Sequence, residues 1–232
     1  MAEVANDSVN PDIGLLRDIN GLAERAPHGV DRAVQILGDH GLIALVALLA
    51  VCCWWRVARR CADAPAAVAG VLWAPLAGGL ALLLNIPIRG FVRRPRPYTE
   101  HDGLDVLARG GHHFSFVSDQ TALTAAVAVA LFMVSRRLGA VALLAALAEG
   151  FTQVYLGADY PTDVVGGFAL GAATTLLLAP LALALLTALT TALATTRLAP
   201  LVRARTARAA VPPPQGDAPT QRQRAEDNGL AA

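Results

Sequence analysis

The sequence predicts an all-α protein: a polytopic membrane bundle of about five transmembrane helices, preceded by amphipathic interfacial helices. Hydrophobic residues make up 55% of the 232 residues and charged residues only 16%, whereas soluble domains carry about 25% charged residues. The mean hydropathy is +0.48. Several apolar runs also reach the ~20 residues that a helix needs to cross the hydrocarbon core of a bilayer. These three observations together indicate a protein embedded in the lipid bilayer.

The chain divides into three regions. In residues 1–40 apolar and charged side chains alternate with a helical period, as expected of helices that lie in the membrane interface. Residues 41–200 form the membrane-embedded domain, and residues 201–232 are polar and rich in proline, which is typical of disorder. The predicted spans are 41–57, 66–88, 118–135, 138–157 and 163–190. The first residues lack a basic stretch followed by an apolar core, so no cleaved signal peptide is expected.

Arginines are distributed unevenly between the two ends of the predicted spans. Because loops on the cytoplasmic side are enriched in basic residues, the richer face is predicted to be cytoplasmic, and the C-terminus with it. That face receives Arg56, Arg59, Arg60, Arg136, Arg137, Arg197, Arg203, Arg205 and Arg208. The opposite, extracytoplasmic face receives the N-terminal region, residues 89–113 and the short loop around Asp159.

Composition also excludes several classes of partner. A net charge of +1 gives no global field that would attract nucleic acid, so none is expected as a partner. Cys52, Cys53 and Cys61 are too few and too clustered for a disulfide framework or a metal site. No metal or other cofactor is therefore predicted.

A cluster of arginines marks the point where the second predicted span leaves the membrane. The segment RGFVRRPRP, residues 89–97, places four arginines within eight residues. A guanidinium donates bidentate, charge-assisted hydrogen bonds to phosphate, and Pro95 and Pro97 stiffen the backbone that carries these side chains. Two interpretations fit the cluster, a phosphate-binding site and a basic juxtamembrane patch attracted to anionic lipid headgroups.

Two further segments are predicted to lie on the same face of the membrane. SFVSDQT, residues 115–121, precedes the third span, where Ser118 or Asp119 is suited to cap the helix N-terminus. Such a terminus also favours an anion. TQVYLGADYPTD, residues 152–163, joins the fourth and fifth spans. All three segments are therefore expected to converge.

The spacing of these segments resembles the signature of the type-2 phosphatidic acid phosphatase superfamily, membrane enzymes that cleave phosphate from lipids. The sequences VYLG and YPTDVVGG are similar to the bacterial undecaprenyl-pyrophosphate phosphatase-like branch. The resemblance covers nearly the whole membrane-embedded region. It implies a helical fold, no metal cofactor and the bacterial plasma membrane as location. It also implies a lipid phosphate or isoprenoid pyrophosphate as the ligand.

The resemblance assigns phosphate contacts to one group of residues. Arg89 stands where the family has lysine, and Arg96 with Pro97 matches the Arg-Pro that follows after six intervening residues. Ser118 matches the family's serine and Asp119 a variant of its bacterial branch. The residues implied to bind phosphate are Arg89, Arg94, Arg96, Ser118 and Gln153, the last in place of a family arginine.

The catalytic positions depart from the family pattern. Gln120 replaces the histidine that protonates the leaving oxygen, and Asp159 replaces the histidine that attacks phosphorus. Asp163 matches the aspartate that orients the attacking histidine. A glutamine amide donates a hydrogen bond but supplies no proton near neutral pH. Histidine-dependent turnover is therefore not expected.

Two functions remain compatible with the sequence. In one, the protein is a lipid phosphatase with altered chemistry, in which Asp159 attacks phosphorus and His101, His112 or His113 supplies the proton. In the other, it is a catalytically inactive relative that binds a lipid phosphate or a partner protein.

Glu149 lies inside the fourth predicted span, one helical turn before Gln153. Carboxylates within a membrane are costly and usually face a cavity or a basic group. We predict an ion pair with Arg89 or Arg96, which makes Glu149 a support for the site. The alternative is a position close enough to the interface to reach water.

Overall fold

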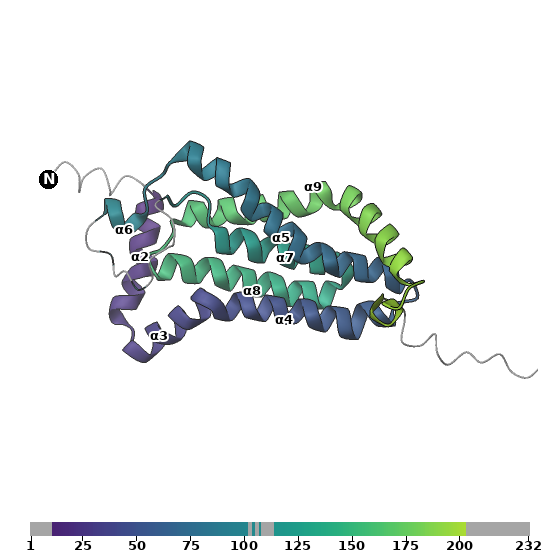
Figure 1. Ribbon diagram of the computed structural model, residues 1–232. Helices are drawn as coiled ribbons and strands as arrows, with labels where there is room; N and C mark the ends of the chain where they lie inside the picture. The colour runs from purple at the N-terminus through teal and green to yellow at the C-terminus, as the bar shows by residue number, and fades with distance from the viewer. Residues whose placement is uncertain (1–10, 102–103, 105–106, 108–113, 203–232) are drawn as a thin grey trace, which may run out of the picture.

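A computed structural model describes residues 11–101, 104, 107 and 114–202, and these residues form a bundle of helices. Five long helices lie side by side (Figure 1). They are α4 (Leu42–Cys52), α5 (Ala64–Val92), α7 (Asp119–Val134), α8 (Arg136–Tyr155) and α9 (Pro161–Leu193). No β-strand occurs in this described part, where the single extended contact is a bridge between Pro95 and Phe114. The all-α prediction is confirmed.

Helix α7 is the centre of the bundle, since it packs against α5, α8 and α9. Its 16 residues span about 24 Å at 1.5 Å per residue, less than the ~30 Å hydrocarbon core. Four other helical segments of the described chain are long and apolar enough to cross a membrane: His28–Arg60, Ala64–Val92, Arg136–Tyr155 and Pro161–Leu193. The short central helix is thus enclosed by longer ones.

The first long helix begins earlier than the sequence predicts. Helix α3 (His28–Ile36) continues through the π-helical turn η1 (Leu37–Gly41) into α4, and the helical run ends after η2 (Cys53–Val57) and η3 (Ala58–Arg60). It therefore starts at His28 and not at residue 41. Part of the polar pattern before residue 41 serves packing on α8, because the Tyr155 hydroxyl donates to Asp31 at 2.8 Å.

Helix α2 (Pro11–Arg25) lies across one end of the bundle, close to the short helix α6 (Pro97–Glu100) (Figure 1). This orientation agrees with an amphipathic helix at a membrane surface. Because the three motif segments also reach this end, we name it the motif end. The other end of the bundle, where α5 and α8 begin, is the opposite end.

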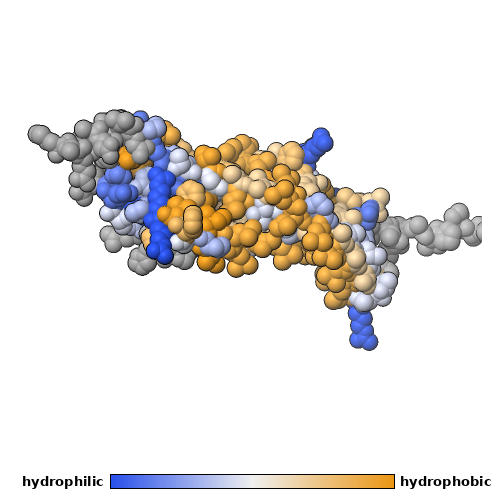
Figure 2. Space-filling view, turned by 90° about the horizontal axis from the view of Figure 1, so that it is seen from above, coloured by the Kyte–Doolittle hydropathy of each residue, from blue (hydrophilic) through white to orange (hydrophobic). Residues whose placement is uncertain are grey.

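An apolar belt crosses the middle of the face seen in Figure 2, and hydrophilic side chains gather toward the two ends of that face. Large hydrophobic side chains are exposed along several helices; Leu177 on α9 is 78% exposed and Leu144 on α8 is 66% exposed. Side chains of this kind are favourable where lipid replaces water. The belt is the surface expected of a membrane-spanning bundle.

Small residues allow the central helices to approach closely. A Cβ atom added to Gly171 of α9 would lie 2.4 Å from the carbonyl oxygen of Ala122 on α7. One added to Gly139 of α8 would lie 2.1 Å from the Cα of Phe132. Close approach through small residues is a common way to associate helices in lipid. Both contacts would be lost with any larger side chain.

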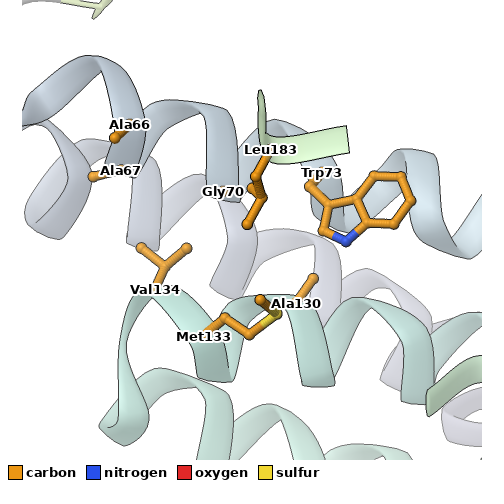
Figure 3. A pocket seen from close by; sticks show the side chains of 8 residues that line it. All are labelled: Ala66, Ala67, Gly70, Trp73, Ala130, Met133, Val134 and Leu183. Carbon is orange, nitrogen blue, oxygen red and sulfur yellow. The ribbon is translucent and has the colours of Figure 1, made fainter. Parts of the chain in front are cut away.

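A small apolar cavity lies toward the opposite end, between α5, α7 and α9 (Figure 3). Its volume is about 240 Å³. Its lining consists of Ala66, Ala67, Gly70, Trp73, Ala130, Met133, Val134 and Leu183. The indole Nε1 of Trp73 donates to the carbonyl oxygen of Thr175 at 3.3 Å, so the one polar atom of this side chain has a partner.

After α9 the chain turns back against the first long helix. Helix α10 (Ala199–Val202) is held by Trp54, whose Nε1 donates to the carbonyl oxygen of Leu201 at 3.2 Å. Arg59 donates to the carbonyl oxygen of Pro200 at 2.6 Å. The predicted disordered tail falls almost entirely on residues 203–232, which lie outside the described residues.

Candidate functional site

The three motif segments come together at the motif end. The backbone amide of Ser115 donates to the carbonyl oxygen of Arg94 at 2.9 Å, and that of Ser118 donates to the carbonyl oxygen of Asp163 at 3.1 Å. Arg96 donates to the carbonyl oxygen of Ala158 at 3.0 Å. Two backbone hydrogen bonds and one from the Arg96 side chain thus link the segment after α5, the start of α7 and the turn between α8 and α9.

Local backbone geometry displays the arginines of the first segment. Helix α5 ends at Val92 and is capped by Arg93, which adopts a left-handed conformation with φ of 51° and donates its backbone N–H to the carbonyl oxygen of Arg89. A left-handed residue of this kind is a common helix terminator. Pro95 and Pro97 follow and fix an extended path. Arg89 therefore projects from the helix, whereas Arg94 and Arg96 project from the following loop.

Arg89 forms an ion pair with Asp119 at the start of α7. Asp119 also accepts a hydrogen bond from Asn85 Nδ2 at 2.7 Å, and the same amide donates to the carbonyl oxygen of Val117 at 2.8 Å. Asn85 is fully buried. The sequence offered no motif that singled out Asn85, although an asparagine one turn before Arg89 in an apolar helix was a usable signal.

Arg94 connects three parts of the molecule. Its Nη1 donates to Asp163 Oδ1 at 3.1 Å and to Thr162 Oγ1 at 2.8 Å, and its Nη2 donates to Asp12 Oδ2 of α2 at 2.5 Å. The guanidinium also lies over the Tyr160 ring, 3.6 Å from its centroid. Through this side chain the interfacial helix α2 is tied to the motif end.

The contact between Arg94 and Asp12 shifts the pKa values of both residues. Burial opposes ionisation of Asp12, but hydrogen bonds from Arg94 and Thr162 outweigh it and hold the pKa of that carboxyl below its usual value. Burial likewise opposes the charge of Arg94, and the hydrogen bond to Asp12 with the nearby Asp163 carboxylate raises the pKa of the guanidinium. Asp12 and Arg94 are therefore both charged at neutral pH. Sequence reasoning missed Asp12, because nothing in α2 indicated contact with residues 94 and 162.

Arg96 forms an ion pair with Asp159, the residue that the sequence predicts to stand at the position of an attacking histidine. Nη1 of Arg96 lies 2.9 Å from Asp159 Oδ1, and the two residues are 7% and 5% exposed. Burial raises the pKa of Asp159 to about 6, although the charge of Arg96 and a hydrogen bond from Ser118 oppose this. The carboxylate of Asp159 is thus already bound to a guanidinium.

Asp163 is fully buried at the start of α9, and both of its carboxylate oxygens have partners. Ser115 donates its hydroxyl to Oδ2, and Arg94 donates to Oδ1. These two residues are the side-chain donors to the aspartate that the sequence predicts to orient a histidine in the family. The sequence pattern assigns Ser115 no role of its own, and the structure supplies this one.

Gln120, Gln153 and Glu149 form a chain of side-chain hydrogen bonds between α7 and α8. Gln153 Nε2 donates to Gln120 Oε1 and to Glu149 Oε1, the latter at 2.8 Å. Glu149 is fully buried, and its Oε2 has no hydrogen-bond partner among the described residues. The predicted ion pair of Glu149 with Arg89 or Arg96 is wrong. Both arginines pair with aspartates of the motif end, and Glu149 reaches only the neutral amide one turn along its own helix.

The charges of this end nearly cancel. Three guanidiniums, of Arg89, Arg94 and Arg96, form the ion pairs described above with four carboxylates, of Asp12, Asp119, Asp159 and Asp163. A phosphate anion that binds the guanidinium nitrogens of these ion pairs therefore has to displace a carboxylate or bind while one is protonated.

The histidines considered as replacement acids are only partly described. The His101 ring lies edge-on to the Tyr160 ring, with centroids 6.2 Å apart, whereas His112 and His113 lie outside the described residues. The described residues contain no group of three or more His, Cys, Asp or Glu side chains that could hold a metal ion.

Comparison with known proteins identifies the family. The PAP2 superfamily matches residues 70–187, a stretch that contains all three motif segments. The chain belongs to the PAP2 superfamily. The predicted resemblance to type-2 phosphatidic acid phosphatases is thereby confirmed.

Two curated relatives share sequence with this PAP2 protein. It is 31% identical over 96 residues to the undecaprenyl-diphosphatase BcrC of Bacillus subtilis (strain 168), a match that covers 41% of the chain and 49% of the relative. The chain thus spans about half the length of that relative. It is 29% identical over 168 residues to the putative undecaprenyl-diphosphatase YbjG of Escherichia coli (strain K12), covering 70% of the chain and 78% of the relative.

Two crystal structures share the fold. Aquifex aeolicus LpxE superposes with a TM-score of 0.57 at 22% identity, covering 74% of this chain and 96% of that one. The transmembrane PAP2-type phosphatidylglycerolphosphate phosphatase of Bacillus subtilis superposes with a TM-score of 0.51 at 23% identity, covering 78% and 90%. Both are helical membrane proteins, in agreement with the bundle described above.

Proposed function

We propose that this PAP2 protein binds the phosphate or pyrophosphate headgroup of a membrane lipid, and does not hydrolyse it by the histidine-dependent route of its family. The observation that carries the proposal is the buried ion pair between Arg96 and Asp159. This pair joins Arg96, which matches the family's phosphate-binding arginine, to Asp159, which stands in place of the family's attacking histidine. The site has therefore kept a cationic framework and lost the groups that perform the reaction.

The arrangement of guanidiniums supports binding of an anion. Arg89, Arg94 and Arg96 reach one end of the bundle from a helix terminus and the loop that follows it. Guanidinium groups recognise phosphate oxygens through paired, charge-assisted hydrogen bonds. Ser118, at the N-terminus of α7, adds a hydroxyl beside Asp159. The start of a helix also favours negative charge.

Two substitutions oppose turnover. Gln120 supplies no proton to a leaving oxygen, and the loss of a general acid costs about 10²–10⁴ in rate. Its amide oxygen is also engaged by Gln153. Asp159 is bound by Arg96, which stabilises the carboxylate and makes it a weaker nucleophile. Both effects act in the same direction.

A second function is favoured by the burial of Asp159. A carboxylate that is 5% exposed beside Arg96 and Ser118 is placed where an aspartyl-phosphate could form. In that reaction a carboxylate oxygen bonds to phosphorus as the bond to the leaving lipid oxygen breaks, and that oxygen takes a proton from an acid such as His101 or from water. Water then cleaves the acyl phosphate, releasing inorganic phosphate and regenerating the carboxylate.

The ligand class and the orientation belong to the same proposal. The printed names of two relatives refer to undecaprenyl diphosphate, which supports an isoprenoid pyrophosphate or phosphate as ligand. Arg56, Arg60, Arg136 and Arg137 lie at the end of the bundle away from the motif residues. The positive-inside rule then favours an extracytoplasmic motif end in a bacterial plasma membrane.

Phosphate release and binding, measured side by side, test the proposal. We expect the detergent-purified protein to release no phosphate from undecaprenyl pyrophosphate or phosphatidic acid, and the Asp159→Asn and Asp159→Ala variants to do the same. Both variants should bind undecaprenyl phosphate at least tenfold more tightly than wild type. A full charge about 4 Å from a phosphate contributes about 4 kcal/mol at an effective dielectric of 20.

Release of phosphate by wild type, abolished in Asp159→Ala, would overturn the proposal and establish the aspartyl-phosphate route. Weaker binding in Asp159→Asn would instead show that the carboxylate assists the ligand. A gain of hydrolysis on combining Gln120→His, Asp159→His and Gln153→Arg would support a retired catalytic scaffold.

A further inference from the structure

A groove runs along the outer face of α5 and ends at the motif end. Its volume is about 720 Å³. It is lined by Gly79, Leu82, Leu83, Ile86, Arg89, Gly90, Phe114 and Asp119. Most of this lining is apolar, and Leu83 and Ile86 are 62% and 63% exposed on the belt that faces lipid. The groove is therefore open to the interior of the membrane along its length.

The polar end of the groove holds an unsatisfied donor. Arg89 is 9% exposed, and its Nε has no hydrogen-bond partner among the described residues. Asp119 pairs with another nitrogen of the same guanidinium. A buried donor without a partner is unfavourable, especially beside hydrocarbon. An oxygen atom of an anionic headgroup would satisfy it.

The length of the groove suits a hydrocarbon chain within one leaflet. Ten residues separate Gly79 from Arg89, which corresponds to about 15 Å along a helix. This is about half of the ~30 Å hydrocarbon core. A chain attached to a phosphate at Arg89 would thus lie against α5 as far as the middle of the membrane.

We infer that this groove binds the hydrocarbon chain of the lipid whose phosphate contacts Arg89, and that the glycine at position 79 keeps its deep end open. The inference rests on the proposed function, because it assumes a phosphate at the motif end. It adds that recognition extends beyond the headgroup. An apolar groove that ends at the guanidinium of Arg89 matches a phosphorylated long-chain lipid better than a free phosphate.

Gly79 offers a substitution that closes the groove and leaves the bundle intact. A Cβ atom added there meets nothing within 4 Å, so a large side chain points into open space and disturbs no packing contact. Ile86, nearer to Arg89, is a second position of the same kind. Leu177 on α9, 78% exposed to lipid and absent from the groove lining, is a matched control.

Binding of three ligands to the purified full-length protein tests the inference. Undecaprenyl phosphate carries chain and phosphate, undecaprenol carries the chain alone, and inorganic phosphate is the headgroup alone. We expect Gly79→Trp and Ile86→Trp to lower the affinity for undecaprenyl phosphate at least tenfold and to leave the affinity for inorganic phosphate unchanged. Leu177→Trp should change neither affinity. The affinity for undecaprenol should fall in the same variants as the affinity for undecaprenyl phosphate.

The outcomes separate the two proposals. Equal affinity of wild type, Gly79→Trp and Ile86→Trp for undecaprenyl phosphate would overturn the inference that the groove binds the hydrocarbon chain. It would leave the proposal of phosphate binding in place. Wild type that binds neither phosphate ligand would overturn the proposed function. If undecaprenol binding were then still sensitive to Gly79→Trp, the groove would stand as a lipid site without a phosphate partner.

Discussion

The two ends of the bundle are held together by different interactions. At the motif end, four ion pairs and a chain of amides join α2, α5, α7, α8 and α9. Toward the opposite end, α5, α7 and α9 meet through small and apolar side chains around a cavity of about 240 Å³. Side chains at the motif end are tied to particular partners, so a single substitution leaves a charge unpaired. Around this cavity most substitutions change side-chain volume and leave no charge unpaired.

The largest effect is expected from breaking a buried ion pair at the motif end. Arg96→Gln leaves Asp159 without its cation in a site where both residues are almost fully buried. Breaking a buried pair by removing one partner costs about 3–5 kcal/mol. We expect a loss of this size in the free energy of unfolding, measured by denaturation in detergent. Arg60→Gln, at an exposed arginine of the opposite end, is the control. Equal losses in the two variants would mean that the ends do not differ as described.

A change of pH should affect the motif end through Asp159. Burial raises the pKa of Asp159 from 3.8 to about 6, so the folded protein binds a proton there that the unfolded chain has released. The stabilisation of the folded state by this proton on Asp159 is therefore full below about pH 4 and is lost as the pH rises through 6. Two pKa units correspond to about 3 kcal/mol. Asp12, with its pKa lowered, acts in the opposite direction and only below about pH 4.

Unfolding measured from pH 4 to pH 7 should therefore show decreasing stability with increasing pH for wild type. In Asp159→Asn this part of the slope should be absent. An identical slope in both proteins would assign the titration to another group.

The smallest effect is expected from overpacking the helix contacts. Gly171→Ala places a methyl group 2.4 Å from the carbonyl oxygen of Ala122, so α7 and α9 have to separate. Overpacking typically costs about 1–3 kcal/mol. Gly79→Ala, whose added Cβ meets nothing within 4 Å, should be close to neutral in the same unfolding assay. If Gly171→Ala left the free energy of unfolding unchanged, α7 and α9 would be able to separate at this contact without cost.

The sequence was sufficient for the fold because hydropathy acts over whole helices. Apolar runs located α5, α8 and α9 as long helices, and no residue-level detail was needed. The first long helix began earlier than predicted because charged residues such as Asp31 suggested an interface, whereas Asp31 accepts a hydrogen bond from Tyr155 in the fold. A polar residue paired within the bundle and one in contact with water have the same appearance in a sequence.

The sequence predicted which motif residues lie together at one end of the bundle but not how they pair. Motif spacing named Arg89, Arg94, Arg96, Asp159 and Asp163, and the structure brings these residues to one end. The same spacing gave no information about which carboxylate each guanidinium contacts. Asp12 and Asn85 lay outside the motifs, and Asp12 meets Thr162 from 150 positions away along the chain. Contacts of that kind depend on how α2 lies across the bundle, which no local pattern encodes.

The unpartnered oxygen of Glu149 has a consequence for attempts to redesign the site by substitution. Oε2 of Glu149 is buried without a partner among the described residues, whereas Gln153 donates to Oε1. We expect arginine to be accepted at position 153, because its additional donors can satisfy the second oxygen. Position 159 differs, because histidine in place of Asp159 would leave Arg96 without its carboxylate. Redesign is therefore expected to be easier when it begins at position 153 than when it begins at position 159.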